Sequence, residues 1–195
     1  MRWWPPIGVA AMVLLGCAVG PGSTPIDDWF QRGSVLGWLL FFTDQRTVGV
    51  ILLGVLALAV VRQRWLLAVL VVATPVAAVW LSRVFKDWFG REKDGAVAYP
   101  SGHTTLMVVV LGMVILVAGA RLYFVVMAIV WVLLGMLGQA VTYHYFTDAI
   151  GGLLLGSSLV CAAAATLEAG AKKAKAGSTG GSARGSVGRS DATRG

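Results

Sequence analysis

The two histidines of this chain each lie in a short polar break between apolar segments. The first, His103, ends the motif Pro100-Ser101-Gly102-His103, and an apolar run follows directly. Serine is a good helix N-cap, glycine leaves its backbone N–H open to a ligand, and the free N–H groups of a helix start bind anions. The motif therefore predicts an anion site in which His103 can donate a proton. The structural alternative is a capped helix with an interfacial histidine.

The second polar break contains His144, and Asp148 follows four residues later. On a helix these two side chains share one face. A carboxylate bonded to one imidazole nitrogen fixes the tautomer and makes the other nitrogen more basic, as an activated nucleophile or base requires. The alternative is a loop histidine beside an aspartate that caps the next helix.

Basic residues gather ahead of the first histidine motif, at Arg83, Lys86, Arg91 and Lys93. A phosphate group has three non-bridging oxygens and needs several positive donors to hold them. The cluster therefore suits phosphate. The alternative is a set of interfacial anchors, with Arg83 extending its charged end toward water.

Composition indicates the kind of element that positions these residues. Hydrophobic residues make up 57% of the chain and charged residues 13%, whereas about a quarter of a soluble domain is charged. The chain therefore needs a lipid solvent. The basic residues behind the net charge of +7 lie mainly at the ends of apolar runs and near the C-terminus, which favours anionic lipid over nucleic acid as a partner. Cys17 and Cys161 lie inside apolar runs and are interpreted as small core residues.

The apolar runs predict an all-α integral membrane bundle of about six transmembrane helices. They cover residues 7–20, 47–61, 65–82, 104–120, 122–142 and 149–167. The first run also has the length of a signal-peptide core. After it, the apolar stretch 33–42 is too short to cross about 30 Å of hydrocarbon as a helix. We expect an interfacial helix or a cover over the site there.

Two parts of the chain differ in composition. Residues 1–169 are expected to form the helical domain, with site loops at 83–103 and 138–148. Residues 170–195 are rich in Gly, Ala, Ser and basic residues, which predicts a disordered tail. Because Lys and Arg are more numerous on the side of the two termini, the positive-inside rule puts both termini in the cytoplasm and both histidines on the outer or periplasmic face of the cell membrane.

Together these motifs resemble the signature of the type 2 phosphatidic acid phosphatases, or lipid phosphate phosphatases. That family carries three blocks, K-x6-R-P, P-S-G-H and S-R-x5-H-x3-D, on a six-helix membrane bundle. Here Lys86 opens the first block, residues 100–103 match the second completely, and His144 and Asp148 end the third. The resemblance covers residues 82–156, and the rest of the chain is similar only in hydropathy.

The resemblance implies a role for each matching residue. His144 would attack phosphorus and form a phosphohistidine, and Asp148 would orient and polarise it. His103 would protonate the leaving group and then activate the water that hydrolyses the intermediate. No metal or other cofactor is implied, because fixed cations and amides supply the charge stabilisation. The expected phosphate-binding residues are Lys86, Arg91, Lys93, Ser101 and Gly102.

Two of the three blocks depart from the signature. Lys93-Asp94 stands where the first block has Arg-Pro, and lysine lacks the planar fork that binds two phosphate oxygens at once. Leu137-Gly138 stands where the third block has Ser-Arg, so one guanidinium is missing. The loss of one preorganised donor costs on the order of 10²–10³ in rate where nothing compensates. Arg91 and Arg83 are the candidates to compensate.

These observations predict a metal-independent phosphatase acting on phosphatidic acid, phosphatidylglycerol phosphate or a polyprenyl phosphate or diphosphate. The alternative is a catalytically weakened or inactive relative that binds lipid phosphate or acts as a membrane interaction protein. A transporter is disfavoured, because the runs show no internal duplication and no charged residue in mid-span. Neither the lipid nor the oligomeric state follows from the sequence.

Overall fold

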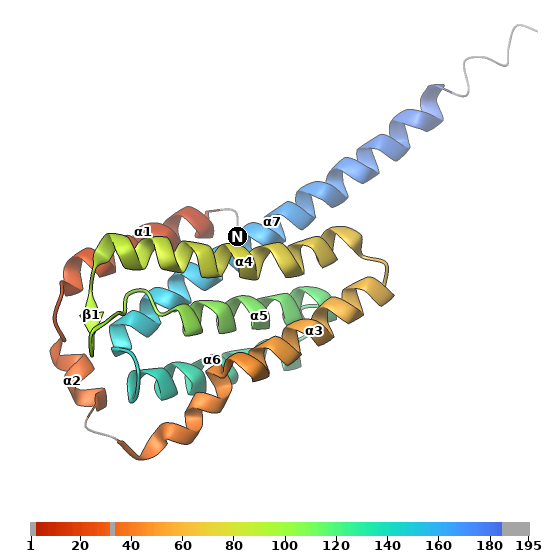
Figure 1. Ribbon diagram of the computed structural model, residues 1–195. Coiled ribbons are helices and arrows are strands. Elements are labelled where there is room, and N and C mark those ends of the chain that lie inside the picture. The colour runs from red at the N-terminus through yellow and green to blue at the C-terminus, as the bar shows by residue number, and fades with distance from the viewer. Residues whose placement is uncertain (1–2, 32–33, 185–195) are drawn as a thin grey trace, which may run out of the picture.

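The fold is a bundle of helices with one short hairpin at its polar end (Figure 1). The computed structural model describes residues 3–31 and 34–184, and over this part of the chain the predicted all-α class is confirmed. The elements in order are α1 (Trp4–Val19), α2 (Pro25–Gln31), the 3₁₀ helix η1 (Ser34–Thr43), α3 (Gln45–Val61), α4 (Trp65–Phe89), β1 (Glu92–Lys93), β2 (Ala96–Val97), α5 (Gly102–Ala118), α6 (Leu122–Ala140) and α7 (Phe146–Arg184).

The helices have the character of a membrane protein. Among the described residues, four helical segments are long and apolar enough to cross a membrane: Gly37–Val61, α4, α6 and Phe146–Ala176. The apolar helices α1 and α5 are shorter, at 16 and 17 residues. Large apolar side chains such as Leu53 and Leu133 point outward and are 66% and 59% exposed. Such surfaces suit lipid, while the count of six spans stays a prediction.

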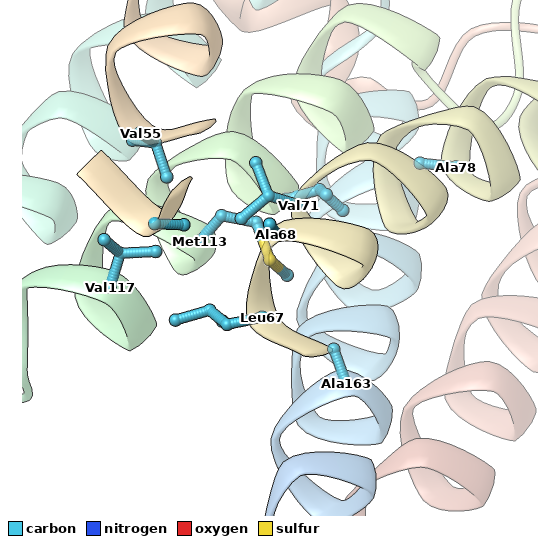
Figure 2. Close-up of a cluster of buried hydrophobic side chains, with 10 residues drawn as sticks. Val55, Leu67, Ala68, Val71, Ala78, Met113, Val117 and Ala163 are labelled. Carbon is cyan, nitrogen blue, oxygen red and sulfur yellow. The ribbon is translucent and has the colours of Figure 1, made fainter. Parts of the chain in front are cut away.

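The central helix is α5, which packs against α3, α4, α6 and α7 (Figure 1). It is apolar on every side, as expected of a helix with no face toward solvent. One core cluster forms where α5 meets α3, α4 and α7, around Val71, Met113 and Val117 (Figure 2). The buried face of α4 repeats at helical spacing and supplies Leu67, Val71 and Ala78 to this cluster.

Two glycines of α7 allow α5 to lie directly against it. A Cβ on Gly152 would stand 2.6 Å from the carbonyl oxygen of Ser101, and one on Gly156 would stand 2.9 Å from Cβ of Val108. Small residues four apart let two helix backbones approach closely. The start of α5 is thereby held beside the start of α7.

The polar segments meet at one end of the bundle, where α2, the hairpin and the start of α5 lie (Figure 1). There α4 ends at Gly90, whose φ of 58° gives a left-handed C-cap. The turn between β1 and β2 places Asp94 and Gly95 at positive φ. The predicted site loops are shorter than expected: α4 continues through Phe89 and α6 through Ala140.

Two other predictions need correction or refinement. The tail was predicted to be disordered from residue 170, but α7 continues to Arg184; the rest, 185–195, lies outside the described residues. The first part of the predicted tail is rich in Ala and Lys, which have high helix propensity, and extending an existing helix needs no new nucleus. The apolar stretch after α2 forms η1, which packs on α6 and leads almost directly into α3.

Candidate active site

His144 and Asp148 face each other at the start of α7. His144 lies in the turn before the helix, and its Nδ1 is 3.7 Å from Oδ2 of Asp148. That distance is too long for a hydrogen bond, and Nδ1 has no other partner among the described residues. Oδ2 of Asp148 also accepts the backbone N–H of Tyr145 at 3.0 Å. The carboxylate is therefore fixed in front of one imidazole nitrogen, at a longer distance than the predicted hydrogen bond.

The two histidines lie close together although they are far apart in the sequence. The ring centroids of His103 and His144 are 6.1 Å apart, with the rings inclined at 58°. His103 occupies the first turn of α5 and is exposed, whereas His144 is buried. The backbone N–H of Ser101 donates to the carbonyl of Asp148 at 3.0 Å. This bond ties the two histidine segments directly to each other.

The Ser101 hydroxyl serves the helix rather than an open site. Its Oγ accepts the backbone N–H of Thr104 at 3.4 Å and the Thr104 hydroxyl at 3.2 Å, and the residue is fully buried. Ser101 is therefore the N-cap of α5. Gly102, the next residue, borders a cavity, so its backbone rather than the serine side chain faces that space.

A cavity of about 220 Å³ lies beside His103. Two cationic side chains, Arg83 and Lys86, line it together with His103. Lys86 is half-buried, and its Nζ donates to the carbonyl of Val97 at 3.0 Å. The full lining is Thr43, Gln45, Val48, Val79, Ser82, Arg83, Lys86, Gly102, His103 and Leu106. The cavity combines positive charge, a helix start and a histidine, which is the chemistry that a phosphate group requires.

Arg91, expected to bind phosphate, is instead held inside the protein. It is 2% exposed, and its Nη1 donates to Thr147 Oγ1 at 2.7 Å and to Asp148 Oδ1 at 2.8 Å. Its Nη2 donates to the carbonyl of Gly22 at 2.8 Å and to Asp27 Oδ2 at 3.0 Å. With both terminal nitrogens engaged, Arg91 is a structural bridge, and it does not replace the missing guanidinium.

Asp27 is a site-region residue that sequence reasoning missed. It is fully buried, and its Oδ1 accepts the backbone N–H of Thr147 at 3.0 Å. Its Oδ2 accepts the backbone N–H and the hydroxyl of Thr24. Burial opposes ionisation, but the bonds from Thr147, Thr24 and Arg91 outweigh it and hold the pKa of Asp27 below its ordinary value. The available signal was the Thr24-x-x-Asp27 spacing, which is typical of a helix start.

Lys93 also has a structural role. Its Nζ donates to the carbonyls of Thr142 at 3.1 Å and His144 at 3.3 Å. Burial lowers the pKa of Lys93, opposed by the nearby charges of Asp94 and Asp148. The residue therefore fixes the turn that carries His144 instead of facing the cavity, because the hairpin directs it toward these two carbonyls.

The position of the missing motif arginine is filled by η1. A Cβ on Gly138 would stand 2.7 Å from the backbone carbon of Leu39 and 2.9 Å from its oxygen. Beside it, Gln139 Nε2 donates to Thr43 Oγ1 at 2.6 Å. No side chain fits at residue 138 while η1 keeps this place. Thr43 itself borders the cation-lined cavity, so η1 is also a wall of the site.

Comparisons with known proteins give no relative: no protein-family model, curated protein or solved structure matches the chain. The resemblance to the lipid phosphate phosphatases therefore consists of the short motifs alone. The described residues contain no cluster of three or more His, Cys, Asp or Glu with the placement of metal ligands. Cys17 and Cys161 are both free thiols.

Proposed function

We propose that this chain is an integral-membrane phosphatase for lipid phosphates, related to the type 2 phosphatidic acid phosphatases. The observation that carries the proposal is the site's composition. The rings of His103 and His144 lie 6.1 Å apart, Asp148 stands behind one of them, and a cavity with two cations borders the other. Two nitrogen bases on either side of one small group suit an in-line displacement at phosphorus.

In this mechanism His144 Nε2 attacks phosphorus while Asp148 supports the proton on Nδ1. The bond between phosphorus and the lipid oxygen breaks, and His103 gives its proton to that oxygen, so a lipid alcohol leaves. His103 then takes a proton from water, and the resulting hydroxide attacks the phosphohistidine. Inorganic phosphate and free His144 are regenerated. The reaction consumes one water for each phosphate released.

Charge stabilisation of the transferring group comes from three groups at the cavity. Lys86 and Arg83 supply positive charge, and the start of α5 at Gly102 presents backbone N–H groups. Arg83 is exposed, as a residue that takes over from a missing motif arginine must be. Lys86 keeps the phosphate-binding role expected from the sequence. Arg91, Lys93 and the Ser101 hydroxyl instead hold the segments that carry the two histidines.

An apolar groove continues from the same cavity between α4 and α5. It has a volume of about 370 Å³ and is lined by Pro75, Val76, Val79, Trp80, Arg83 and Leu106. Val79, Arg83 and Leu106 border both spaces. A phosphate on the cations would thus place its ester substituent along an apolar surface, which favours a lipid over a soluble phosphate ester.

Phosphate release from purified protein tests the proposal. In detergent with a metal chelator present, the wild type is expected to release phosphate from at least one of phosphatidic acid, phosphatidylglycerol phosphate and a polyprenyl phosphate or diphosphate. His144→Ala should abolish release, and Lys86→Met should reduce it by on the order of 10²-fold because one preorganised cation is lost. Arg121→Met, which removes a cation outside the site, serves as the control and should leave the rate unchanged.

A trapping experiment tests the intermediate. Acid-labile, base-stable label from a phosphate-labelled lipid should appear on the wild type and be absent from His144→Ala. A wild type that releases no phosphate from any of these lipids contradicts the proposal, as does a His144→Ala variant that is equally active.

A lipid-phosphate-binding protein without turnover is the second candidate. The packing of η1 against Gly138 favours it, because the family's third cation cannot be accommodated there. Binding of a lipid phosphate that weakens in Lys86→Met, combined with no phosphate release, would identify this function.

A further inference from the structure

Three charged side chains form a buried row behind His144. Asp27, Arg91 and Asp148 are 0%, 2% and 0% exposed. Arg91 joins the two carboxylates, with Nη2 3.0 Å from Asp27 Oδ2 and Nη1 2.8 Å from Asp148 Oδ1. The far end of the row is Asp148 Oδ2, which is 3.7 Å from His144 Nδ1. A side chain of α2 is therefore connected, through one guanidinium and the Asp148 carboxylate, to the histidine in the turn before α7.

The charge balance of this row depends on Asp27. Two carboxylates and one guanidinium leave one net negative charge, and the end of the row facing His144 is a carboxylate. Without Asp27, Arg91 would pair with Asp148 alone and neutralise it. A neutral ion pair attracts an imidazole N–H much less strongly than a carboxylate whose positive partner is shared with a second carboxylate. Burial makes this difference larger than it would be in water.

The geometry also depends on Asp27. Thr147 precedes Asp148, and both its backbone N–H and its hydroxyl donate to Asp27. The same hydroxyl accepts from Arg91 Nη1 at 2.7 Å. Asp27 therefore holds both the guanidinium and the residue next to Asp148, which fixes the direction in which the Asp148 carboxylate points.

We propose that Asp27 is a positioning residue of the active site, acting through Arg91 to leave one net negative charge on the row and to direct the Asp148 carboxylate at Nδ1 of His144. Nδ1 then carries the proton, and Nε2 is left as the atom that attacks phosphorus. The catalytic consequence depends on the function proposed above, whereas the effect on the His144 tautomer does not. The sequence motifs include neither Asp27 nor an Asp–Arg–Asp row.

The other charged groups around His144 do not replace this arrangement. Lys93 binds the backbone carbonyl of His144, not its ring. His103, across the site, faces the cavity that holds Lys86 and Arg83. Tyr145 stacks under Arg91, with the guanidinium carbon 4.5 Å from its ring centroid. Asp148 is the carboxylate that the structure places against the His144 ring.

Nitrogen NMR of protein labelled on histidine measures the tautomer directly. The chain has two histidines, so a His103→Gln variant assigns both signals. In the wild type at neutral pH, we expect the proton of His144 on Nδ1. In Asp27→Asn, which keeps the shape but removes the charge, we expect the proton to be shared between Nδ1 and Nε2. Asp28→Asn removes an exposed charge from the same helix and should leave the tautomer as in the wild type.

Kinetics give a second readout. Asp27→Asn should lower kcat on the order of 10- to 100-fold, the usual effect of losing a residue that orients a catalytic group. KM should stay within about twofold, because Asp27 does not border the cavity. Asp28→Asn should change neither constant.

If Asp27→Asn fails to fold, Asp27→Asn/Arg91→Gln answers the same question. That variant keeps the net charge of the row at one negative, now carried by Asp148 alone, whose Oδ2 still accepts the Tyr145 N–H, so the wild-type tautomer should return. The proposal is overturned by a wild type protonated on Nε2, by a folded Asp27→Asn with the wild-type tautomer, or by a double variant with a shared proton. If the protein releases no phosphate but Asp27→Asn changes the His144 tautomer, the proposed function is refuted and this inference is supported. If the protein is active but Asp27→Asn leaves the tautomer unchanged, the proposed function is supported and this inference is refuted.

Discussion

At the scale of single residues, basic side chains of similar appearance in the sequence have different tasks. Lys86 and Arg83 border the cavity beside His103. Arg91 and Lys93, only a few residues later, bond to groups of the protein and do not line that cavity. These two environments differ because α4 ends at Gly90. Arg83 and Lys86 lie on α4, whereas Arg91 and Lys93 lie in the segment that follows it. Charge alone did not distinguish these two environments.

The acid sensitivity of the fold is a prediction at this scale. The pKa of Asp27 is held below its ordinary value of 3.8, so its carboxylate contributes stability that is fully present above that value. This stability is lost as the pH falls through the lower, folded-state pKa. Thermal unfolding in detergent should therefore show a steeper loss of stability below about pH 4 for the wild type than for Asp27→Asn.

The same variant separates this effect from general acid unfolding. At neutral pH Asp27→Asn should be less stable by about 1–3 kcal/mol, the cost of weakening buried hydrogen bonds. The difference between the two proteins should shrink toward acid pH. A gap that stays constant across the range would contradict the role of the Asp27 charge.

At the scale of elements, the approach of α5 to α7 sets the distance between the two histidine motifs. Gly152 lies under the carbonyl of Ser101, and Ser101 donates to the carbonyl of Asp148. The two helix starts are joined by packing on one side and by a hydrogen bond on the other. Precision of the site therefore depends on α7 having glycine at this position.

Gly152→Ala tests this packing. The added methyl group would stand 2.6 Å from the Ser101 oxygen, which is backbone and cannot rotate away. We expect a loss of about 1–3 kcal/mol in the free energy of unfolding and a fall in phosphate release, since the helices must separate. Gly54→Ala on α3 is the control: a Cβ there meets none of the described atoms within 4 Å, so it should be neutral or stabilising by up to about 1 kcal/mol. Equal effects of the two changes would contradict the packing argument.

Local pattern predicted the helices and the pairing of the motifs, because hydropathy and short spacings are properties of adjacent residues. Long-range geometry decided the rest. Asp27 is 120 residues from Thr147 and 64 from Arg91 in the sequence, so no local pattern shows these contacts. Likewise, Gly138 appeared as a missing arginine, and only the path of η1 explains why glycine is required there.

At the scale of the whole molecule, the two ends of the bundle are built differently. The end with the histidines carries the hairpin, α2 and the cavity (Figure 1). At the opposite end, Arg62 and Arg64 donate to the last carbonyls of α5, at Val117 and Leu116. Basic residues at helix C-terminal ends satisfy free carbonyls and favour the cytoplasmic side. These arginines are among those from which the positive-inside rule predicts that the site lies on the outer face.

Thiol labelling in intact cells tests that orientation. In a variant with Cys17 and Cys161 replaced by alanine, a cysteine introduced by Ala96→Cys in the hairpin should react with a membrane-impermeant reagent. Ala96 is exposed, so access is limited only by the membrane. Gln63→Cys, in the loop at the opposite end, should react only after lysis. The reverse pattern would place the site in the cytoplasm.

The hydrogen bond from Ser101 to Asp148 has a mechanical consequence. It links the start of α5 to the start of α7, so the segments that carry His103 and His144 are held against each other by a backbone bond. Under the proposed function, a spacing fixed in this way would leave little ordering for the moment when a lipid phosphate binds. Adjustment to lipids of different width would then be expected at the wall that this bond does not include, the junction of η1 and α3 at Thr43 and Gln45.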